Sequence, residues 1–501
     1  MKRFIGLFAF FGLLAASCSD DDNSPQDPGG TDPDPVAYSS GSADFATYVA
    51  VGNSLTAGFS DGALFASGQA ASFPNMLATS FAEAGGGAFN IPFMADDLGG
   101  ATLAGNTILD NRFILSFATG SPSPTRLDGT PSTEISTVLT NGPFNNMGVP
   151  GAKSYHLLAP NYGNVQGVES GAANPYYVRF AAAPQATILA DAIAQSATFF
   201  TLWVGNNDIL GYATAGGAGI NQLNNLDPST YGGNDISDPN VVAGSINTIL
   251  ENMTANGAGG AIANLPDVTT IPYFSAVPYN PVALDPDTAA LLNNAFMAYN
   301  QGLAAIQQQG AISADEMNRR TISFSAGEGN PVVLIDEDLT DLTGINPALT
   351  NMRQATEADL LVLPASTFIG TPVNDDPTML NGISVPLTDQ WVLTPEEQQA
   401  VVTATTAYNA SIEALATQYD IAFVDANSFL RSIAENGFPL ADGSTVTAVF
   451  ATGGGFSLDG VHPSPRGYAL LANLFIDAIE EKYQAVLPRA DPLEFTGLYI
   501  D

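Results

Sequence analysis

Apolar and polar positions alternate along this chain with two different periods. The runs "YVAVG" (Tyr48–Gly52) and "ATFFTLWVG" (Ala197–Gly205) are continuously apolar over the length of a strand that is covered on both faces. Further strands are expected near Ile262, Leu334, Val362 and Val424. Other segments repeat their apolar residues every three or four positions, as an amphipathic helix does. In the clearest of them, which follows Ser464 and Pro465, the repeating residues are Tyr468, Leu471, Ala472, Phe475 and Ile479.

The alternation of short buried strands with amphipathic helices is typical of an α/β fold with a mostly parallel sheet. This pattern begins near residue 46, and we expect one domain over residues 46–490. The chain has 49 Gly and 33 Pro, which predicts long irregular loops between the elements. The segments near 213–236 and 311–390 are longer than a minimal sheet requires, so we expect insertions there, close to the strand ends that carry a ligand site.

The charge of the chain excludes one large class of partners. Thirteen Lys and Arg stand against 50 Asp and Glu, which gives a formal net charge of −37. Such a surface repels the phosphates of nucleic acids and of anionic lipid headgroups. We therefore expect no nucleic-acid partner and a soluble domain outside the cytoplasm. The oligomeric state is not indicated by the sequence.

The first residues predict an export signal and not a part of the fold. Lys2 and Arg3 precede an apolar stretch that is too short for a membrane span, and small residues then lead to Cys18, the only cysteine in the chain. Residues 1–17 resemble the signal peptide of a bacterial lipoprotein, which implies cleavage before Cys18, lipid on its thiol and attachment to a membrane. The alternative is an ordinary secretory signal followed by a chance cysteine.

Residues 18–45 contain the stretch "SDDDNSPQDPGGTDPDP", which is acidic, rich in Pro and Gly and without apolar periodicity. Such a composition predicts a flexible tether that holds the domain away from the membrane. Acidic residues directly after the lipidated cysteine also resemble the export tag of surface lipoproteins in some Gram-negative bacteria. We expect an outer-membrane lipoprotein of the cell envelope, exposed at the cell surface.

Two segments far apart in the sequence contain the first candidate chemistry. Ser54 follows the apolar run 48–52 in "YVAVGNSLTAGFSDG", where it is either a nucleophile at a strand end or an ordinary helix cap. His462, one of only two histidines, lies in "SLDGVHPSPRGY" three residues after Asp459. A serine that attacks an acyl carbon needs a base within hydrogen-bond reach and a carboxylate that orients this base. Asp459 and His462 suit these two roles.

Two more segments are expected at the same edge of the sheet. In "LWVGNNDIL" an apolar strand ends at Gly205 and is followed by Asn206, Asn207 and Asp208. Ligand sites in open α/β sheets lie at this carboxyl edge. In "NNMGVPGAKS" the glycines Gly148 and Gly151 enclose a tight loop, which is either a plain turn or a source of backbone N–H groups for the same site.

In this order, "GNSLTAGF", "NMGVPGA", "GNND" and "DGVHP" resemble the four sequence blocks of the SGNH hydrolases, also called the GDSL esterase/lipase family. The resemblance implies a three-layer α/β/α sandwich with a flavodoxin-like sheet. It also implies Ser54 as nucleophile, His462 as base and Asp459 as its orienter. The implied oxyanion hole consists of the N–H groups of Ser54 and Gly151 and the side-chain amide of Asn207. Asn206 and Asp208 are then supporting residues, and His156 has no assigned role.

One residue departs from the family pattern, because Asn53 stands where the family name has an aspartate. This position neighbours the nucleophile and is not one of the three catalytic residues, so an amide can form similar hydrogen bonds there. The expected reaction is hydrolysis of a carboxylic ester, of a lipid or of an acylated glycan, through an acyl-enzyme. The alternative is an inactive glycan-binding or structural lipoprotein on the same scaffold.

No cofactor and no metal are expected for this chemistry. The acidic stretch "DEDLTD" (336–341) invites a calcium interpretation. It lacks the glycine and the distal glutamate of an EF-hand loop. A solvated acidic loop is therefore the expectation.

Overall fold

The computed structural model describes residues 37–118 and 122–500. The predicted signal peptide 1–17, the lipidation site Cys18 and the predicted tether as far as residue 36 lie outside the described residues. Within them, no helix combines the length and the apolar character that a membrane span requires.

Five parallel strands form the central sheet. Their spatial order is β6 (Asn146–Gly148), β1 (Tyr48–Gly52), β7 (Phe199–Trp203), β8 (Gly259–Ala263) and β17 (Ala422–Val424). By position along the chain this order is 2-1-3-4-5, the flavodoxin-like arrangement, whose strand order reverses between β1 and β7. The predicted α/β fold with a parallel sheet is confirmed, and β1 has the predicted bounds. β6 is a strand that the sequence analysis expected as a loop.

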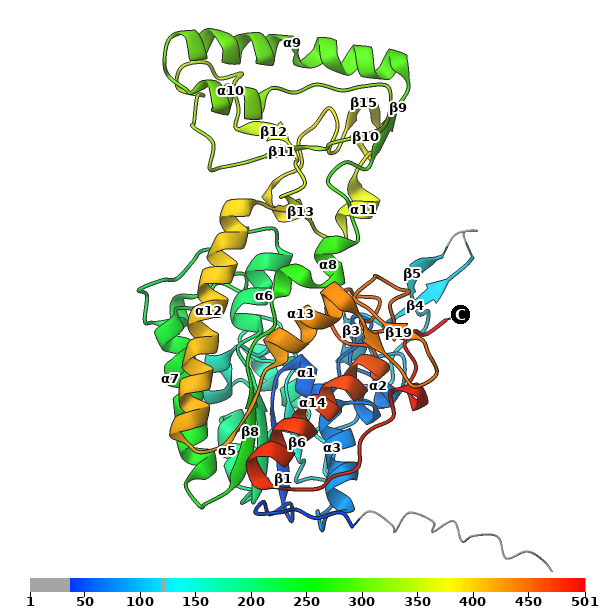
Figure 1. The fold of residues 1–501 in the computed structure, drawn as a ribbon, viewed down its shortest axis with the longest axis vertical. Coiled ribbons are helices and arrows are strands. Elements are labelled where there is room, and N and C mark those ends of the chain that lie inside the picture. The colour runs from blue at the N-terminus through cyan, green and yellow to red at the C-terminus, as the bar shows by residue number, and fades with distance from the viewer. Residues whose placement is uncertain (1–36, 119–121, 501) are drawn as a thin grey trace, which may run out of the picture. The chain divides into compact units, whose positions relative to one another are not determined.

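Helices cover both faces of this sheet (Figure 1). One layer contains α3 (Phe73–Ala82) and α14 (Pro465–Tyr483), and the other contains α5 (Ile188–Ile193), α7 (Pro239–Thr254) and α12 (Pro395–Gln418). The predicted three-layer sandwich is therefore present. The predicted last helix starts where Ser464 and Pro465 indicated, because Ser464 Oγ accepts a hydrogen bond from Gly467 N at 3.1 Å.

Aromatic side chains join the first helical layer to the sheet. Phe199 and Trp203 lie four positions apart on β7, so both point to the same face. Phe199 packs edge-on against Phe81 of α3 with ring centroids 5.5 Å apart, and Trp203 packs against both Phe73 of α3 and Phe475 of α14, which are stacked on each other. All five rings are buried to 99% or more. This contact fixes the end of β7 relative to α3, and α3 follows the segment that contains Ser54.

The predicted insertion 311–390 belongs to a longer run from β9 (Val282–Leu284) to β16 (Val392–Leu393). It contains α9 (Pro286–Gln308), α10 (Ala314–Arg320) and α11 (Ala365–Phe368) with short antiparallel pairs. Those pairs are β9 with β10 (Gly327–Asn330), β11 (Val333–Ile335) with β12 (Met352–Gln354), β13 (Leu360–Leu361) with β16, and β14 (Pro372–Val373) with β15 (Asp376–Leu380). The strands expected near Leu334 and Val362 exist, but they pair locally and do not join the central sheet. A short apolar run predicts burial without specifying the strand that it pairs with.

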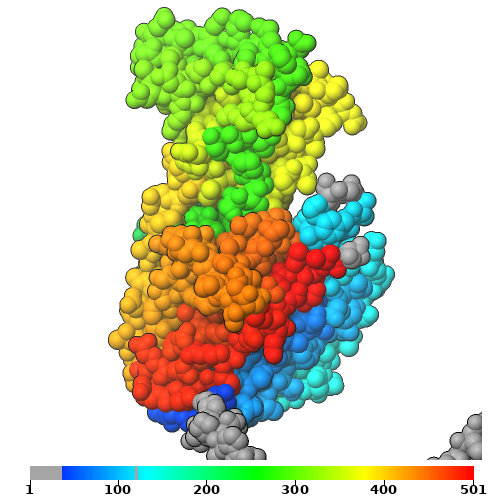
Figure 2. Space-filling model, turned by 45° about the vertical axis from the view of Figure 1, so that its right-hand side comes forward, coloured from blue at the N-terminus to red at the C-terminus, as the bar shows by residue number. Residues whose placement is uncertain are grey.

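The remaining elements are short. They are α1 (Ser54–Ala57), α2 (Ala66–Ala70), α4 (Pro175–Val178), α6 (Asn207–Thr214), α8 (Pro272–Ser275), α13 (Ala426–Asn436), β2 (Ala101–Leu103), β3 (Asn106–Leu109), β4 (Phe113–Ser116), β5 (Ser123–Arg126), β18 (Phe438–Pro439) and β19 (Thr445–Val446). Figure 2 shows the C-terminal segment, in red, beside the β4–β5 hairpin, in cyan. A hydrogen bond from Leu115 N to Tyr499 O, 2.9 Å long, joins the two.

The close approach of α1 to β6 requires a glycine. A Cβ atom on Gly148 would lie 2.7 Å from the backbone carbon of Thr56, which real structures do not tolerate. We expect Gly148→Ala to lower the free energy of unfolding by roughly 1–3 kcal/mol because backbone must move. Gly244→Ala is the control: it lies in α7 with no atom within 4 Å of the new methyl group, so a gain of about 1 kcal/mol is expected. Thermal unfolding monitored by circular dichroism checks both, and equal shifts would contradict the packing argument.

Candidate active site

Ser54 occupies the first turn after β1. Asn53 caps the short helix α1, since its Oδ1 accepts a hydrogen bond from Leu55 N at 3.0 Å. Ser54 is therefore the first helical residue and not its cap, which rules out the alternative interpretation of this serine. Its side chain is 94% buried, and its Oγ remains available for another partner.

That partner is His462, which lies 408 positions further along the chain. Ser54 Oγ and His462 Nε2 are 2.9 Å apart, and His462 Nδ1 lies 2.8 Å from Asp459 Oδ2. The structure thus brings together the serine, imidazole and carboxylate that the sequence analysis selected, in the order in which proton transfer from serine requires them. The ring of Phe59 packs 4.6 Å from the imidazole and covers one side of it.

Four hydrogen bonds in addition to the histidine ring fix the carboxylate of Asp459. The N–H groups of Val461 and His462 donate to Oδ1 at 2.8 Å, Ser457 Oγ donates to Oδ1 at 3.0 Å, and Gly62 N donates to Oδ2 at 2.9 Å. Burial alone would raise the pKa of Asp459, but the charge of His462 and the hydrogen bonds from His462 and Val461 prevail and lower it to about 2. Asp459 is therefore a stable carboxylate at neutral pH.

The segment that supports Asp459 includes residues that the sequence analysis did not select. Asp61 is 98% buried, its N–H donates to Ser457 Oγ, and its Oδ1 accepts from Leu458 N at 2.9 Å. Burial raises the pKa of Asp61 to about 6, and the nearby charge of Asp459 adds to this rise. The sequence signal for this contact is the "SDG" at the end of the Ser54 block, where Asp61 and Gly62 directly follow Ser60.

Asn207 begins α6, directly after β7 and across the switch point from Ser54. One N–H of its side-chain amide donates to Ala152 O at 2.9 Å, which places Asn207 beside the Gly151 loop. Gly151 has a φ of +79°, a conformation that favours glycine. Among the described residues, the backbone N–H groups of Ser54 and Gly151 donate to no other group. Asn207 thus contacts the Gly151 loop and shares a cavity wall with Ser54.

The supporting residues form two further contacts. Asn53 Nδ2 donates to Asn206 Oδ1 at 2.9 Å, so the ends of β1 and β7 are tied by a pair of buried amides. Asp208 is fully buried and accepts from Ser154 N at 2.8 Å and from Ser154 Oγ at 3.0 Å. Burial raises the pKa of Asp208, against the lowering effect of these bonds. Its position anchors the chain immediately after the Gly151 loop.

The Gly151 loop is also joined to the predicted insertion 213–236. Lys153 is 96% buried, and its Nζ donates to the backbone oxygens of Asp235 at 2.9 Å and Gly232 at 3.3 Å. The second histidine, His156, does not contact Ser54. It is stacked on Tyr162 with ring centroids 4.6 Å apart, and burial lowers its pKa to about 4, so it is neutral at physiological pH.

No family model, no curated protein and no solved structure matches this chain.

One group of carboxylates away from Ser54 has the spacing of a metal site. Within the described ranges, ligand oxygens of Glu337, Asp389 and Glu397 lie within 4.8 Å of one another. Glu337 comes from the predicted acidic loop 336–341, but that loop is only partly solvated, because Asp336 is 99% buried and forms an ion pair with Arg353 at 2.5 Å. The oxygen donors suit a hard cation.

The protonation of this group predicts a pH dependence of stability. Burial raises the pKa of Glu397 to about 8, and Asp389 and Glu337 raise it further against hydrogen bonds from Thr394. An unfolded glutamate has a pKa of about 4.3. Between these values the folded protein binds more protons than the unfolded chain, so the free energy of unfolding falls as the pH rises through this window. We expect Glu397→Gln to reduce that fall.

Unfolding of the parent and of Glu397→Gln at a series of pH values measures this effect. Glu413→Gln, which removes an exposed acid from the same helix, is the matched control. The same pH slope in all three proteins would contradict the assignment of a protonated Glu397.

Proposed function

We propose that this protein is a serine hydrolase that cleaves carboxylic esters through an acyl-enzyme at Ser54. The observation that carries the proposal is the continuous chain of contacts from Ser54 Oγ to His462 at 2.9 Å and from His462 to Asp459 at 2.8 Å. The histidine comes from the loop before α14, while the serine comes from the turn after β1. Such an arrangement is what a nucleophilic serine needs: a base that accepts its proton and a carboxylate that orients the base.

In the proposed reaction, Ser54 Oγ attacks the carbonyl carbon of the ester while His462 Nε2 takes the hydroxyl proton. Asp459 accepts a hydrogen bond from Nδ1–H, which fixes the tautomer and stabilises the imidazolium. The tetrahedral intermediate expels the alkoxide, which receives the proton from His462. A water molecule then attacks the acyl-serine while His462 takes its proton, and the second tetrahedral intermediate expels Ser54 Oγ, which recovers the proton from His462 as the acid leaves.

The negative charge of the tetrahedral intermediate needs donors that already point toward it. In the proposal these are the N–H groups of Ser54 and Gly151, which have no other acceptor among the described residues, and the second N–H of the Asn207 amide. The bond from Asn207 to Ala152 O orients this amide before substrate binds. Asn206 and Asp208 hold the two loops at their observed separation.

The four sequence blocks around these residues support membership of the SGNH hydrolases as part of the proposal. The substrate is an ester of a lipid or of an acylated glycan. We also propose that the protein is an outer-membrane lipoprotein, anchored through lipid on Cys18 and exposed on the cell envelope. The acidic residues that follow Cys18 would keep the domain away from anionic lipid headgroups.

Replacement of the nucleophile tests the reaction itself. We expect Ser54→Ala to reduce hydrolysis of 4-nitrophenyl acetate to the background rate, because no covalent intermediate can form. Ser80→Ala removes another buried serine, whose Oγ donates to Pro488 O, and serves as the control with parental activity. Equal rates for the parent and Ser54→Ala on all esters would leave the inactive binding scaffold as the better account.

Removal of one oxyanion donor tests the geometry. Asn207→Ala is expected to lower kcat by about 100- to 1000-fold. Asn473→Ala is the matched control, because Asn473 is also half-buried and donates from its amide to an alanine carbonyl, Ala490 O, at 2.8 Å. Steady-state kinetics on 4-nitrophenyl acetate decide the question, and a kcat of Asn207→Ala within a few-fold of the control would overturn the role of this amide.

A further inference from the structure

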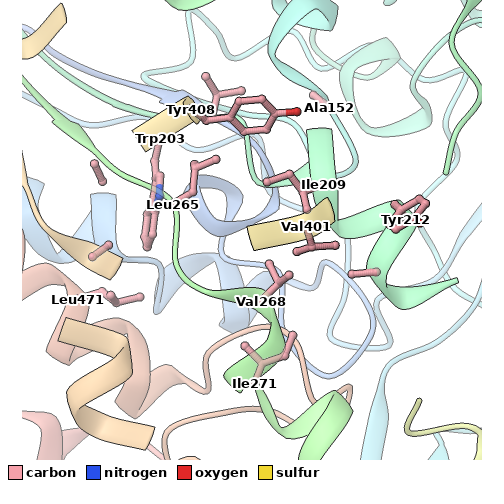
Figure 3. Close-up of a cluster of buried hydrophobic side chains, with 14 of the residues drawn as sticks. Ala152, Trp203, Ile209, Tyr212, Leu265, Val268, Ile271, Val401, Tyr408 and Leu471 are labelled. Atoms are coloured by element: carbon pink, nitrogen blue, oxygen red, sulfur yellow. The ribbon is translucent and has the colours of Figure 1, made fainter. Parts of the chain in front are cut away.

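Two cavities of very different size border the proposed site, one lined by Ser54 and the other by Asn174, which is bonded to the Gly151 loop. The first, which we call the acyl slot, has a volume of about 40 Å³, and its wall includes Ser54, His462, Asn206 and Asn207. The rest of its wall is apolar. Figure 3 shows Trp203, Val268, Ile271 and Leu471 from this wall within the hydrophobic cluster. The slot therefore joins the proposed nucleophile to the core of the protein.

The size of the acyl slot limits what fits behind the carbonyl carbon. One water-sized group needs about 10–15 Å³, so the slot has space for roughly three water-sized groups, which corresponds to about one or two methyl groups. Four side chains of its wall belong to the packed core, because each is at least 94% buried: Trp203, Val268, Ile271 and Leu471. A longer chain would have to displace them, and close-packed interiors resist such displacement.

The second cavity, which we call the tyrosine cavity, has a volume of about 1270 Å³. It borders the Gly151 loop through Asn174, which lines the cavity and donates from Nδ2 to Pro150 O at 2.8 Å. Tyr155 and His156 also line it and belong to the short helix directly after that loop, Ser154–Leu158. The tyrosine cavity therefore begins next to one of the three proposed oxyanion donors.

The lining of the tyrosine cavity combines apolar side chains with aromatic rings and hydroxyl groups, and Glu169 is the one carboxylate among its lining residues. Tyr155, Tyr162 and Tyr231 supply aromatic surface, and no Lys or Arg lies in the lining. The hydroxyl groups of Tyr155 and Ser245 line the cavity and form no hydrogen bond with another described residue. Aromatic faces combined with free hydroxyl groups suit sugar rings, and the lack of cations disfavours phosphate headgroups.

We propose that the site hydrolyses short acyl groups, of about two or three carbon atoms, from an uncharged carbohydrate. The acyl group occupies the acyl slot, and the sugar occupies the tyrosine cavity. This inference rests on the proposed esterase function and selects one of its two substrate classes. The opposite arrangement, with a long acyl chain in the tyrosine cavity, is the lipid-ester alternative.

A chain-length profile tests the acyl slot. The full-length parent is assayed on 4-nitrophenyl acetate, butyrate and octanoate, with Ser54→Ala as the blank. We expect kcat/KM on octanoate to be at least about 100-fold below that on acetate. Leu210, a half-buried residue of the slot wall, is replaced by alanine, which should raise the octanoate-to-acetate ratio about 10-fold. Leu415→Ala, a half-buried leucine of α12, should not change the ratio.

Acetylated xylo-oligosaccharides test the tyrosine cavity. Tyr231→Ala should lower the ratio of kcat/KM on these oligosaccharides to kcat/KM on 4-nitrophenyl acetate about 10-fold, because a stacking surface is lost. Tyr419→Ala is the matched control. Tyr419 is also half-buried, and its hydroxyl donates to Asn247 Oδ1, as that of Tyr231 donates to Asn225 O. Equal ratios in the two variants would overturn the assignment of the sugar to this cavity.

The outcomes separate the two proposals. A parent with Ser54-dependent activity that cleaves octanoate as fast as acetate overturns the inference and leaves the esterase function intact. Equal effects of Leu210→Ala and Leu415→Ala overturn the acyl slot in the same way. If no ester gives Ser54-dependent hydrolysis, both the function and the inference fall.

Discussion

The hydrogen bond between Ser54 and His462 is the contact on which the arrangement of the site depends. It joins the turn after the first strand to the loop before the last helix of the described domain, across 408 positions of sequence. Neighbouring residues position both partners. Asn53 caps α1 and leaves Ser54 Oγ free. Asp459 accepts a hydrogen bond from the ring of His462, while four donors fix its carboxylate. A serine is a weak nucleophile without such a base, so these supports are what the proposed chemistry requires.

The topology of the sheet explains why these residues meet. In a 2-1-3-4-5 sheet the chain leaves β1 and β7 toward opposite faces, and a crevice opens at their carboxyl ends. Ser54 follows β1, Asn207 follows β7, and Gly148 ends β6 on the other side of β1. The amide pair of Asn53 and Asn206 closes the base of this crevice. Asn53 therefore has a defined structural use: it caps α1 and ties it to the segment that follows β7.

Much of this arrangement was predictable from the sequence because it depends on local signals. A continuous apolar run predicted β1, and a serine followed by proline predicted the start of α14. The few histidines directed attention to His462. Other features depend on contacts between distant segments. β6 is three residues long and contains Asn146, so no period identifies it, and the strands at Val333–Ile335 and Leu360–Leu361 carry no signal for their partners. The carboxylate group of Glu337, Asp389 and Glu397 combines three segments, and sequence spacing cannot indicate such a meeting.

The size of a cavity is likewise a property of the packed structure alone. Trp203, Val268 and Ile271 look in the sequence like ordinary core residues, and they are core residues. Their position beside Ser54 turns them into walls that select the acyl group in the proposed reaction. Tyr155 and Tyr231 are separated by 76 positions, but both face the cavity beside the Gly151 loop. In the proposed reaction, substrate choice therefore depends on how distant segments of the chain pack around Ser54.

The most direct test of the account is covalent labelling of the nucleophile. The full-length protein is treated with a fluorophosphonate, which reacts with serines that are activated by a base, and the modified peptide is identified by mass spectrometry. We predict one adduct, on Ser54, that is lost in His462→Ala. An adduct on a different serine, or unchanged labelling of Ser54 without His462, would contradict the activation of Ser54 by His462.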